Sequence, residues 1–515
     1  MINSSTAEYV FIRTCVFLLS VITPIGLLCA AYDALNHACT LSGNFLAPPQ
    51  SIRVWLWAEA VFYLVVYLPL AFRLQRPAEH PRLQPIESRA KLFGRITKDM
   101  AAADLEHQIR GWFRGARLED IGRDGIRDWL AWALFEGRVE SEEKSYQAEL
   151  ECYVNRWEEI LERRFTPGHG SAEAIRLTLD PVRPSYRSLL WYSCVGFVDL
   201  VTYIRLIWGG YYHHRLARRH FFRLFPLRPV ALTAQHKSPA SHLSYWHRPH
   251  TSNMHLPVVF IHGIGIGLWP YVDFLRDIVA LESGHDSAPR DGEIGILAFE
   301  IMPVSFRITH SALSKDAMCA EIKAILDQHG WKEFVLISHS YGSVIATNVL
   351  HNSDLQPRIS SMVFVDPVCF LLHNPDVAYN FTCRSPARAN EWQLWYFASA
   401  DPGVAHTLGR RFFWSENVLW LEDLHEIMKK RDMRVTVSLG ERDLIADTTS
   451  VGRYLAGVKR NPDGTWPEHW KRENWRGEGL DVIWNEDQDH SQVFDSKQSR
   501  AGLVAAVKTY CEAAR

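Results

Sequence analysis

Apolar residues are concentrated in two long runs near the N-terminus. The first run, from Thr14 to Tyr32, contains 19 consecutive uncharged residues. A helix of that length crosses the ~30 Å hydrocarbon core of a bilayer. The second run, from Val54 to Phe72, is interrupted by a single charged residue, Glu59. Together the two runs predict a pair of membrane helices.

The connection between the two runs favours a helical hairpin, because it is about 20 residues long and contains Pro48-Pro49. A hairpin that crosses the bilayer and one that lies in a single leaflet both fit this pattern. A cleaved signal peptide is the rival interpretation of the first run. Arg13 is the only basic residue before the run and no A-x-A cleavage site follows it, so we predict an anchor.

Basic residues gather directly after the second run, whereas the connection carries only Asp33 and Arg53. The positive-inside rule therefore places the connection on the far side of the membrane and the rest of the chain in the cytoplasm. The organelle stays open, with the endoplasmic reticulum and lipid droplets as candidates. The basic residues are Arg73, Arg76, Arg82, Arg89, Lys91 and Arg95, against Glu79 and Glu87.

A third apolar stretch, from Ser188 to Trp208, contains Asp199 and Arg205. A charge near the bilayer centre costs about 2.5–3.5 kcal/mol on insertion scales, so a buried or interfacial helix is favoured over a third span. The segment that follows, 215–228, is basic and aromatic. Contact with anionic lipid and a solvated helix face are both open interpretations of it.

The chain between the anchor and the third stretch has the apolar spacing of amphipathic helices, over 118–135 and again over 142–165. It contains no motif with catalytic chemistry. We therefore predict a membrane anchor at 1–95, a helical region for packing or partner docking at 96–250, and a separate domain at 251–515.

From Leu256 onward, short apolar segments alternate with helical stretches such as 315–329 and 342–350. Continuous apolar strands between helices are typical of a mostly parallel sheet that is buried on both faces. The pattern therefore predicts an α/β domain. Its strands are expected at 257–261, 295–300, 333–337, 362–365, 434–439 and 480–484.

The composition is that of a globular protein, with 47% hydrophobic and 22% charged residues. Lys and Arg total 56 and Asp and Glu total 58, and the resulting net charge of −2 argues against a dedicated nucleic-acid-binding role. The 9 cysteines are scattered and form no C-x-x-C pair. This indicates reduced thiols rather than a disulfide framework or a zinc site.

The polar segment 239–257 contains four histidines: His242, His247, His250 and His255. Histidine is a common metal ligand, but a loop lacks the fixed i, i+4 geometry and no carboxylate or cysteine accompanies these residues. We therefore predict no metal site and no organic cofactor.

The expected strand at 333–337 runs directly into Ser338-His339-Ser340-Tyr341-Gly342, after which a helix begins. A nucleophilic serine on a tight strand-to-helix turn needs small residues two positions before and after it, here Ser338 and Gly342. The helix N-terminus favours the negative charge that develops during acyl transfer. The alternative is a serine-rich turn in an ordinary α/β protein.

This pattern resembles the serine esterases and lipases of the α/β-hydrolase superfamily, and the resemblance covers residues 256–515. Ser338 departs from the usual G-x-S-x-G motif. The resemblance implies that His262-Gly263-Ile264-Gly265 forms an oxyanion loop, in which the amides of Ile264 and Tyr341 stabilise the oxyanion. A dinucleotide-binding loop is the rival for this segment, but the G-x-G-x-x-G spacing is absent.

The resemblance also implies an acid after the strand at 434–439 and a histidine after the last strand. Asp443 and His490 occupy these places, and Ser340, Asp443 and His490 follow one another in the order of the superfamily. Asp447 and Asp366 are rivals for the acid. A surface histidine beside acidic residues is the alternative for His490.

An aromatic-rich segment, about 368–433, lies where hydrolases of this kind insert a cap. Its aromatic residues would roof a hydrophobic acyl pocket, touch the bilayer or fill the core of the cap itself.

The sequence therefore predicts a membrane-anchored serine hydrolase that cleaves an apolar or lipid ester through an acyl-enzyme intermediate. A lipid acyltransferase with the same triad is an alternative, and His490 with Asp495 forms an H-x-x-x-x-D motif seen in some of them. A non-catalytic membrane scaffold with the same fold is another. In a third alternative, the helical region recruits partners and the hydrolase half has only a secondary role. The expected partners are the membrane and an apolar ester substrate.

Overall fold

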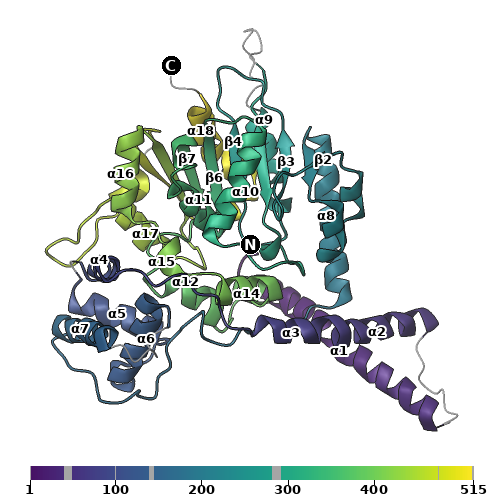
Figure 1. The fold of residues 1–515 in the computed structure, drawn as a ribbon, viewed down its shortest axis with the longest axis horizontal. Coiled ribbons are helices and arrows are strands. Elements are labelled where there is room, and N and C mark those ends of the chain that lie inside the picture. The colour runs from purple at the N-terminus through teal and green to yellow at the C-terminus, as the bar shows by residue number, and fades with distance from the viewer. Residues whose placement is uncertain are drawn as a thin grey trace.

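The computed structural model describes residues 2–39, 49–98, 100–137, 144–280, 292–473 and 475–512. The strands in these ranges are β1 (Tyr212–Arg215), β2 (His236–Lys237), β3 (Ser244–Arg248), β4 (Val258–Ile261), β5 (Ile296–Glu300), β6 (Phe334–His339), β7 (Ile359–Val365), β8 (Arg434–Gly440) and β9 (Leu480–Asn485). They form one sheet in the order β2-β1-β3-β5-β4-β6-β7-β8-β9 (Figure 1). β3 runs antiparallel to β1 and β5, and the other neighbouring pairs are parallel.

Strands β4 to β9 are the six that the sequence predicts, and helices cover both faces of this part of the sheet. In β4, Val258 and Phe260 share a core with helices α9 (Val272–Ala280) and α18 (Lys497–Cys511). Val259 and Ile261 share the opposite core with α10 (Lys315–Gln328) and α11 (Gly342–Leu350). Strands β4 to β7 are buried on both faces and therefore have mostly apolar sequences, whereas the edge strand β9 is half-buried. The prediction of a mostly parallel sheet between helices is confirmed.

The sheet extends further toward the N-terminus than the predicted domain start at residue 251. β1, β2 and β3 come from residues 212–248 and add three strands beyond β5. Their sequences are short and carry histidine, tyrosine and arginine in place of an apolar run. Strands of this kind give no periodic signal. The polar segment that contains His247 is therefore partly a strand rather than a loop.

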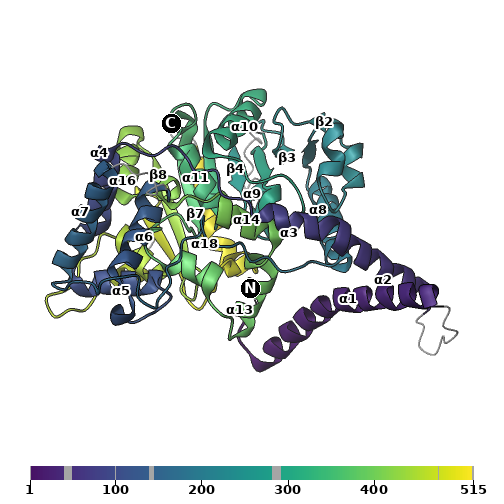
Figure 2. The same cartoon turned by 60° about the horizontal axis from the view of Figure 1, so that its bottom comes forward.

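The N-terminal helices form a hairpin. α1 (Thr6–Cys39) lies beside α2 (Gln50–Phe62), and α2 continues through a π-helical turn into α3 (Leu68–Leu74). Figure 2 shows the two long helices projecting away from the sheet. Among the described residues, three helices are long and apolar enough to cross a membrane: Thr6–His37, Gln50–Leu74 and Leu189–Trp208.

Glu59, which interrupts the second apolar run, is completely buried. Its carboxylate accepts hydrogen bonds from the amides of Leu189 (2.9 Å) and Leu190 (3.2 Å), at the start of α8 (Leu189–Trp208). The first amides of a helix have no partner within the helix, and the helix dipole favours an anion there. Glu59 therefore fastens the hairpin to α8.

Replacing Glu59 with alanine is expected to destabilise the protein by about 1–3 kcal/mol, because the buried amides of α8 lose a charged acceptor. Thermal unfolding in detergent measures this as a lower midpoint. Glu79→Ala is the matched control, because the Glu79 side chain is 79% exposed. Equal midpoints for the two variants would show that Glu59 does not hold α8.

One face of α8 packs on the sheet domain, while Phe197, Ile207 and Trp208 on the other face are exposed. Asp199 forms ion pairs with Arg228 (2.8 Å) and Arg307 (2.7 Å), both of which are buried. The charge that makes a third span costly is thus paired inside the protein.

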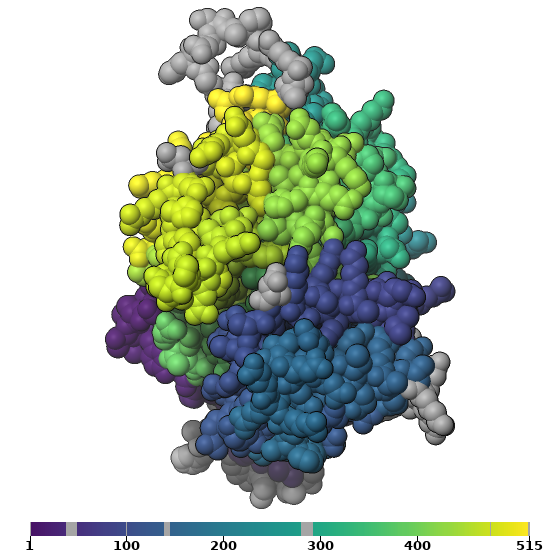
Figure 3. All heavy atoms as spheres, turned by 90° about the vertical axis from the view of Figure 1, so that its left-hand side faces the viewer, coloured from purple at the N-terminus to yellow at the C-terminus, as the bar shows by residue number. Residues whose placement is uncertain are grey.

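The helical region is packed against the cap, as Figure 3 shows for the blue helices below the green and yellow surface. The indole of Trp112 donates to the carbonyl of His373 (2.9 Å), and the indole of Trp414 donates to that of Ala133 (3.0 Å). Parts of the helical region therefore pack against the cap. The region contains α4 (Ile86–Thr97), α5 (Ala102–Trp112), α6 (Arg123–Phe135) and α7 (Lys144–Ile160). The cap contains α12 (Asp376–Ala378), α13 (Ala389–Gln393), α14 (Pro402–Arg410), α15 (Trp414–Asn417) and α16 (Leu421–Arg431), and α17 (Thr448–Leu455) follows β8.

Candidate active site

Ser340 sits on the turn between β6 and α11, with a φ of 51°. A positive φ is strained for serine and is tolerated where the surrounding structure enforces it. Gly342 is required for this turn, because a Cβ there would lie 2.4 Å from the carbonyl oxygen of Ile261. Ser338, the departure from the G-x-S-x-G motif, is a buried residue of β6 and fits as part of a regular strand.

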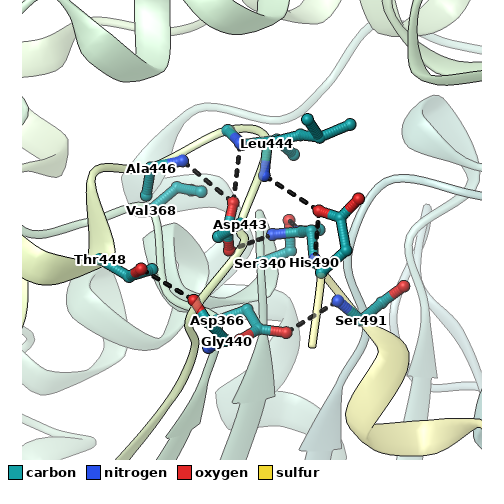
Figure 4. Close-up of polar contacts among 12 residues, drawn as sticks. Ser340, Asp366, Val368, Gly440, Asp443, Leu444, Ala446, Thr448, His490 and Ser491 are labelled. Carbon is teal, nitrogen blue, oxygen red and sulfur yellow. Dashed lines mark hydrogen bonds and ion pairs between the residues drawn. The ribbon is translucent and has the colours of Figure 1, made fainter. Parts of the chain in front are cut away.

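The structure brings Ser340, His490 and Asp443 into one chain of hydrogen bonds (Figure 4). Nε2 of His490 lies 2.9 Å from Oγ of Ser340, and Nδ1 of His490 lies 2.7 Å from Oδ2 of Asp443. The other oxygen of Asp443 accepts from the amides of Ile445 (2.7 Å) and Ala446 (3.1 Å). These bonds orient the carboxylate toward the imidazole, which is the geometry of a nucleophile, a base and an orienting acid.

The two rival carboxylates have other partners. Asp366 accepts from the amides of Gly440 (3.0 Å) and Ser491 (2.8 Å), so it ties the end of β8 to the loop that carries the histidine. Asp447 caps α17 through the amide of Ser450 (3.0 Å). Of these three carboxylates, Asp443 alone hydrogen bonds to the ring of His490 in the described part of the chain.

The pKa values of Asp366 and His490 are both shifted in the site. Burial raises the pKa of Asp366 to about 7. Burial alone would lower the pKa of His490, but the negative charge of Asp443 and its hydrogen bond outweigh it and raise the pKa to about 9. The site therefore favours an imidazolium ion, the form that a general base adopts once it has taken a proton.

The predicted oxyanion loop lies beside the serine. A Cβ on Gly263 would stand 2.7 Å from Cβ of Ser340, so the close approach requires glycine. His262 holds the loop in place: its Nε2 accepts from the amide of Ile301 (2.9 Å), which leaves Nδ1 to donate to the carbonyl of Gly263 (2.7 Å). The loop is thereby tied to the end of β5.

The amides of Gly263 and Gly265 are engaged, with Oη of Tyr271 (3.3 Å) and the carbonyl of Val304 (3.1 Å). In contrast, no hydrogen bond from the amides of Ile264 or Tyr341 to another part of the chain is found within the described ranges. These are the two amides that the resemblance assigns to the oxyanion.

An apolar cavity of about 50 Å³ opens at Ser340. Its wall comes mainly from three parts of the chain. These are the turn at Ser340 with the oxyanion loop, the cap, and the helical region that the sequence assigns to packing or partner docking. The lining includes Ile264, Ser340, Val368, Ala378, Phe381, Leu408 and Phe412, together with Trp112, Trp132 and Leu177 from the helical region.

Sequence reasoning does not find the contribution of Trp112 and Trp132, because they occupy apolar positions of amphipathic helices like any core residue. It also does not find Asp489, whose carboxylate accepts from the amides of His490 (2.7 Å) and Leu444 (3.0 Å). Asp489 thus joins the loops that carry the histidine and Asp443. Its place immediately before His490 is the one signal in the sequence.

Residues 257–474 match the model of a family described as alpha/beta hydrolase fold. The C-terminal half of the chain therefore has the α/β-hydrolase fold that its sequence resembles, and a helical region with apolar helices precedes it. No curated protein matches the chain in sequence.

Many solved structures are similar to the chain, among them a phospholipase A and two carboxylesterases. A membrane phospholipase A described as a bacterial virulence factor is 12% identical, with a TM-score of 0.36, over 63% of this chain and 94% of that chain. A carboxylesterase from Nitrososphaera gargenis is 13% identical, with a TM-score of 0.34, over 53% and 97%. A carboxylesterase from Bacillus subtilis is 10% identical, with a TM-score of 0.35, over 61% and 98%. Similarity at this level carries nothing about substrate.

Proposed function

We propose that this protein is a membrane-anchored serine hydrolase that cleaves an apolar ester, with Ser340 as nucleophile, His490 as base and Asp443 as orienting acid. The observation that carries the proposal is the hydrogen-bonded chain of these three side chains at the mouth of an apolar cavity. Labelling of Ser340 by a fluorophosphonate probe tests it.

In the proposed reaction, Oγ of Ser340 attacks the acyl carbonyl while Nε2 of His490 takes the hydroxyl proton. Asp443 stabilises the imidazolium, and the amides of Ile264 and Tyr341 donate to the oxyanion of the tetrahedral intermediate. Collapse of the intermediate breaks the ester bond, and His490 returns the proton to the leaving alcohol. Water then attacks the acyl-enzyme by the same steps and releases the acid.

The apolar cavity supports an alkyl acyl group as the part of the substrate that lies beside Ser340. Its lining is almost entirely hydrocarbon and indole, which excludes a charged or strongly hydrated acyl group. The small volume of about 50 Å³ favours one unbranched chain.

Replacing Ala378 with leucine is expected to shorten the accepted acyl chain, because the larger side chain takes up much of the cavity. One methylene in an apolar pocket is worth about 1–3 kcal/mol, so kcat/KM for a long-chain p-nitrophenyl ester should fall by about tenfold or more. The acetate ester should be hydrolysed as before. Ala387→Leu, on an exposed position of the cap, is the matched control. A uniform loss across chain lengths would contradict the assignment of the pocket.

The raised pKa of His490 predicts an alkaline pH profile. The base must be neutral to accept the proton of Ser340, and below its pKa of about 9 most of it is protonated. On this basis kcat/KM should rise with pH through the neutral range, by about tenfold per unit well below the pKa. Initial rates from about pH 6 to about pH 10 check this. A plateau that begins near the usual histidine pKa would contradict it.

The anchor and the cap support a lipid substrate. The amide of Ile2 donates to Oε1 of Gln393 in the cap (2.9 Å), and the guanidinium of Arg13 in α1 lies 3.8 Å from the ring centre of Trp392. The start of the hairpin therefore contacts the cap, which covers the acyl cavity. A bilayer around the hairpin would lie next to the cap, within reach of a lipid ester. The basic segment after the hairpin supports a cytoplasmic location for the catalytic half.

A further inference from the structure

Three histidines that are distant in the sequence meet at the end of the sheet opposite Ser340. His214 lies in β1, His247 lies in β3, and His329 follows the last residue of α10. In the β1–β3 ladder His214 pairs with Tyr245, and residues 245 and 247 point to the same face. The ladder therefore places His214, Tyr245 and His247 on one face, where His329 joins them.

Ring nitrogens of the three histidines converge. One nitrogen from each ring lies within 4.8 Å of one from each of the others. The hydroxyl of Tyr245 lies 2.9 Å from Nδ1 of His214 and 2.9 Å from Nε2 of His329. A phenol has one proton, so it donates to only one of these two nitrogens at a time. Nitrogens of three imidazoles thus lie close together, and the phenol oxygen lies beside two of these rings.

The three imidazoles can serve as metal ligands. All three rings are buried or half-buried, and a neutral imidazole carries one nitrogen lone pair that can bind a metal ion. The electrostatic influences on the three rings come from one another and from the neighbouring His213 and His236.

We propose that His214, His247 and His329 bind a divalent transition-metal ion of the zinc class, with the oxygen of Tyr245 as the fourth ligand. Imidazole nitrogen prefers Zn²⁺, Co²⁺ and Ni²⁺ over Mg²⁺ or Ca²⁺. Zinc binds four ligands tetrahedrally at about 2.0–2.1 Å from nitrogen, which a small inward movement of the rings provides. The phenol proton of Tyr245 leaves to solvent when the ion binds.

The proposed ion adds to the contact that Tyr245 already makes between β3 and His329. β1 and β3 belong to the outer edge of the sheet, whereas His329 precedes β6 near its centre. Ligands from both would fasten the edge strands to the end of α10. The site is structural and does not depend on the chemistry at Ser340. The proposal revises the prediction of no metal site. That prediction treated the histidines of 239–257 as residues of one loop, whereas the proposed ligands come from strand β3 and from two segments distant in the sequence.

The test is a titration of the full-length protein, purified without a polyhistidine tag and stripped with a chelator, with Co²⁺. We expect one equivalent to bind, with the visible absorption bands of tetrahedral Co²⁺, and Zn²⁺ to displace it. Thermal unfolding should show a higher midpoint in the presence of either ion.

Variants separate this site from surface binding. His247→Ala and His329→Gln should each weaken Co²⁺ binding by at least the roughly 10–100-fold that loss of an outer ligand partner costs. Tyr245→Phe should weaken it less. His425→Ala, on an exposed position of α16, should bind like the wild type. Unfolding midpoints without metal identify any variant that fails to fold. Absence of saturable binding by the wild type overturns the proposal, as does unchanged binding by folded His247→Ala and His329→Gln proteins.

Discussion

Replacing Ser340 with alanine is expected to abolish fluorophosphonate labelling and to lower kcat for an ester substrate by about 10⁴–10⁶-fold. The side chain that forms the acyl-enzyme is then missing, and His490 has no hydroxyl to deprotonate. The oxyanion amides and the binding cavity would remain, so a small residual rate above that of water is expected.

The measurement compares wild-type protein, Ser340→Ala and Ser385→Ala after solubilisation in detergent. Ser385 is an exposed serine of the cap and serves as the matched control. Equal labelling of all three proteins would place the nucleophile elsewhere. Folded wild-type protein that does not label at all would favour a non-catalytic scaffold. Product analysis with an acceptor alcohol present distinguishes hydrolysis from acyl transfer.

Replacing Asp443 with asparagine should lower kcat by about 10⁴-fold, because the amide favours the wrong tautomer of His490. The acid limb of the pH profile should also move to lower pH. The charge of Asp443 is what raises the pKa of His490 above its ordinary value, so a neutral partner lowers that pKa.

The variants Asp366→Asn and Asp447→Asn are the controls for Asp443→Asn. Asp366 hydrogen bonds to backbone amides rather than to the imidazole, so its variant should lose far less activity. Asp447 caps a helix, and its variant should have nearly normal turnover. A loss of about 10⁴-fold in Asp366→Asn together with a mild effect in Asp443→Asn would reverse the assignment of the acid.

Strands β4 to β9 could be predicted because most of them are buried on both faces and contain apolar runs such as Val258–Ile261. The strand-to-helix turn at Ser340 could also be predicted from the sequence, since a strand, small residues and a helix follow one another within a short segment. The edge strands were not, because β1, β2 and β3 owe their conformation to pairing with one another and, through β3, with β5 rather than to their own pattern.

The residues of the candidate site likewise fall into those that the sequence predicts and those that it does not. Ser340, Asp443 and His490 each follow a strand, and parallel strands bring their carboxyl ends to one edge of the sheet. Local sequence therefore sufficed to nominate them. Trp112 and Trp132 reach the acyl cavity only because the helical region folds onto the cap, and the three clustered histidines meet only through the sheet. Contacts of this kind depend on tertiary packing, which a single sequence does not display.

The pairing of β3 with β5 has a practical consequence for anyone who expresses part of this protein. A fragment that starts at residue 251 would lack β3 and expose the backbone donors and acceptors of β5, whose five residues are all buried in the intact chain. An open, apolar strand edge recruits strands from other molecules, so such a fragment is expected to aggregate. A soluble fragment must therefore keep the residues from α8 onward. Trp112 and Trp132, whose indoles line the acyl cavity, lie upstream of α8 and would be absent from a fragment that begins there.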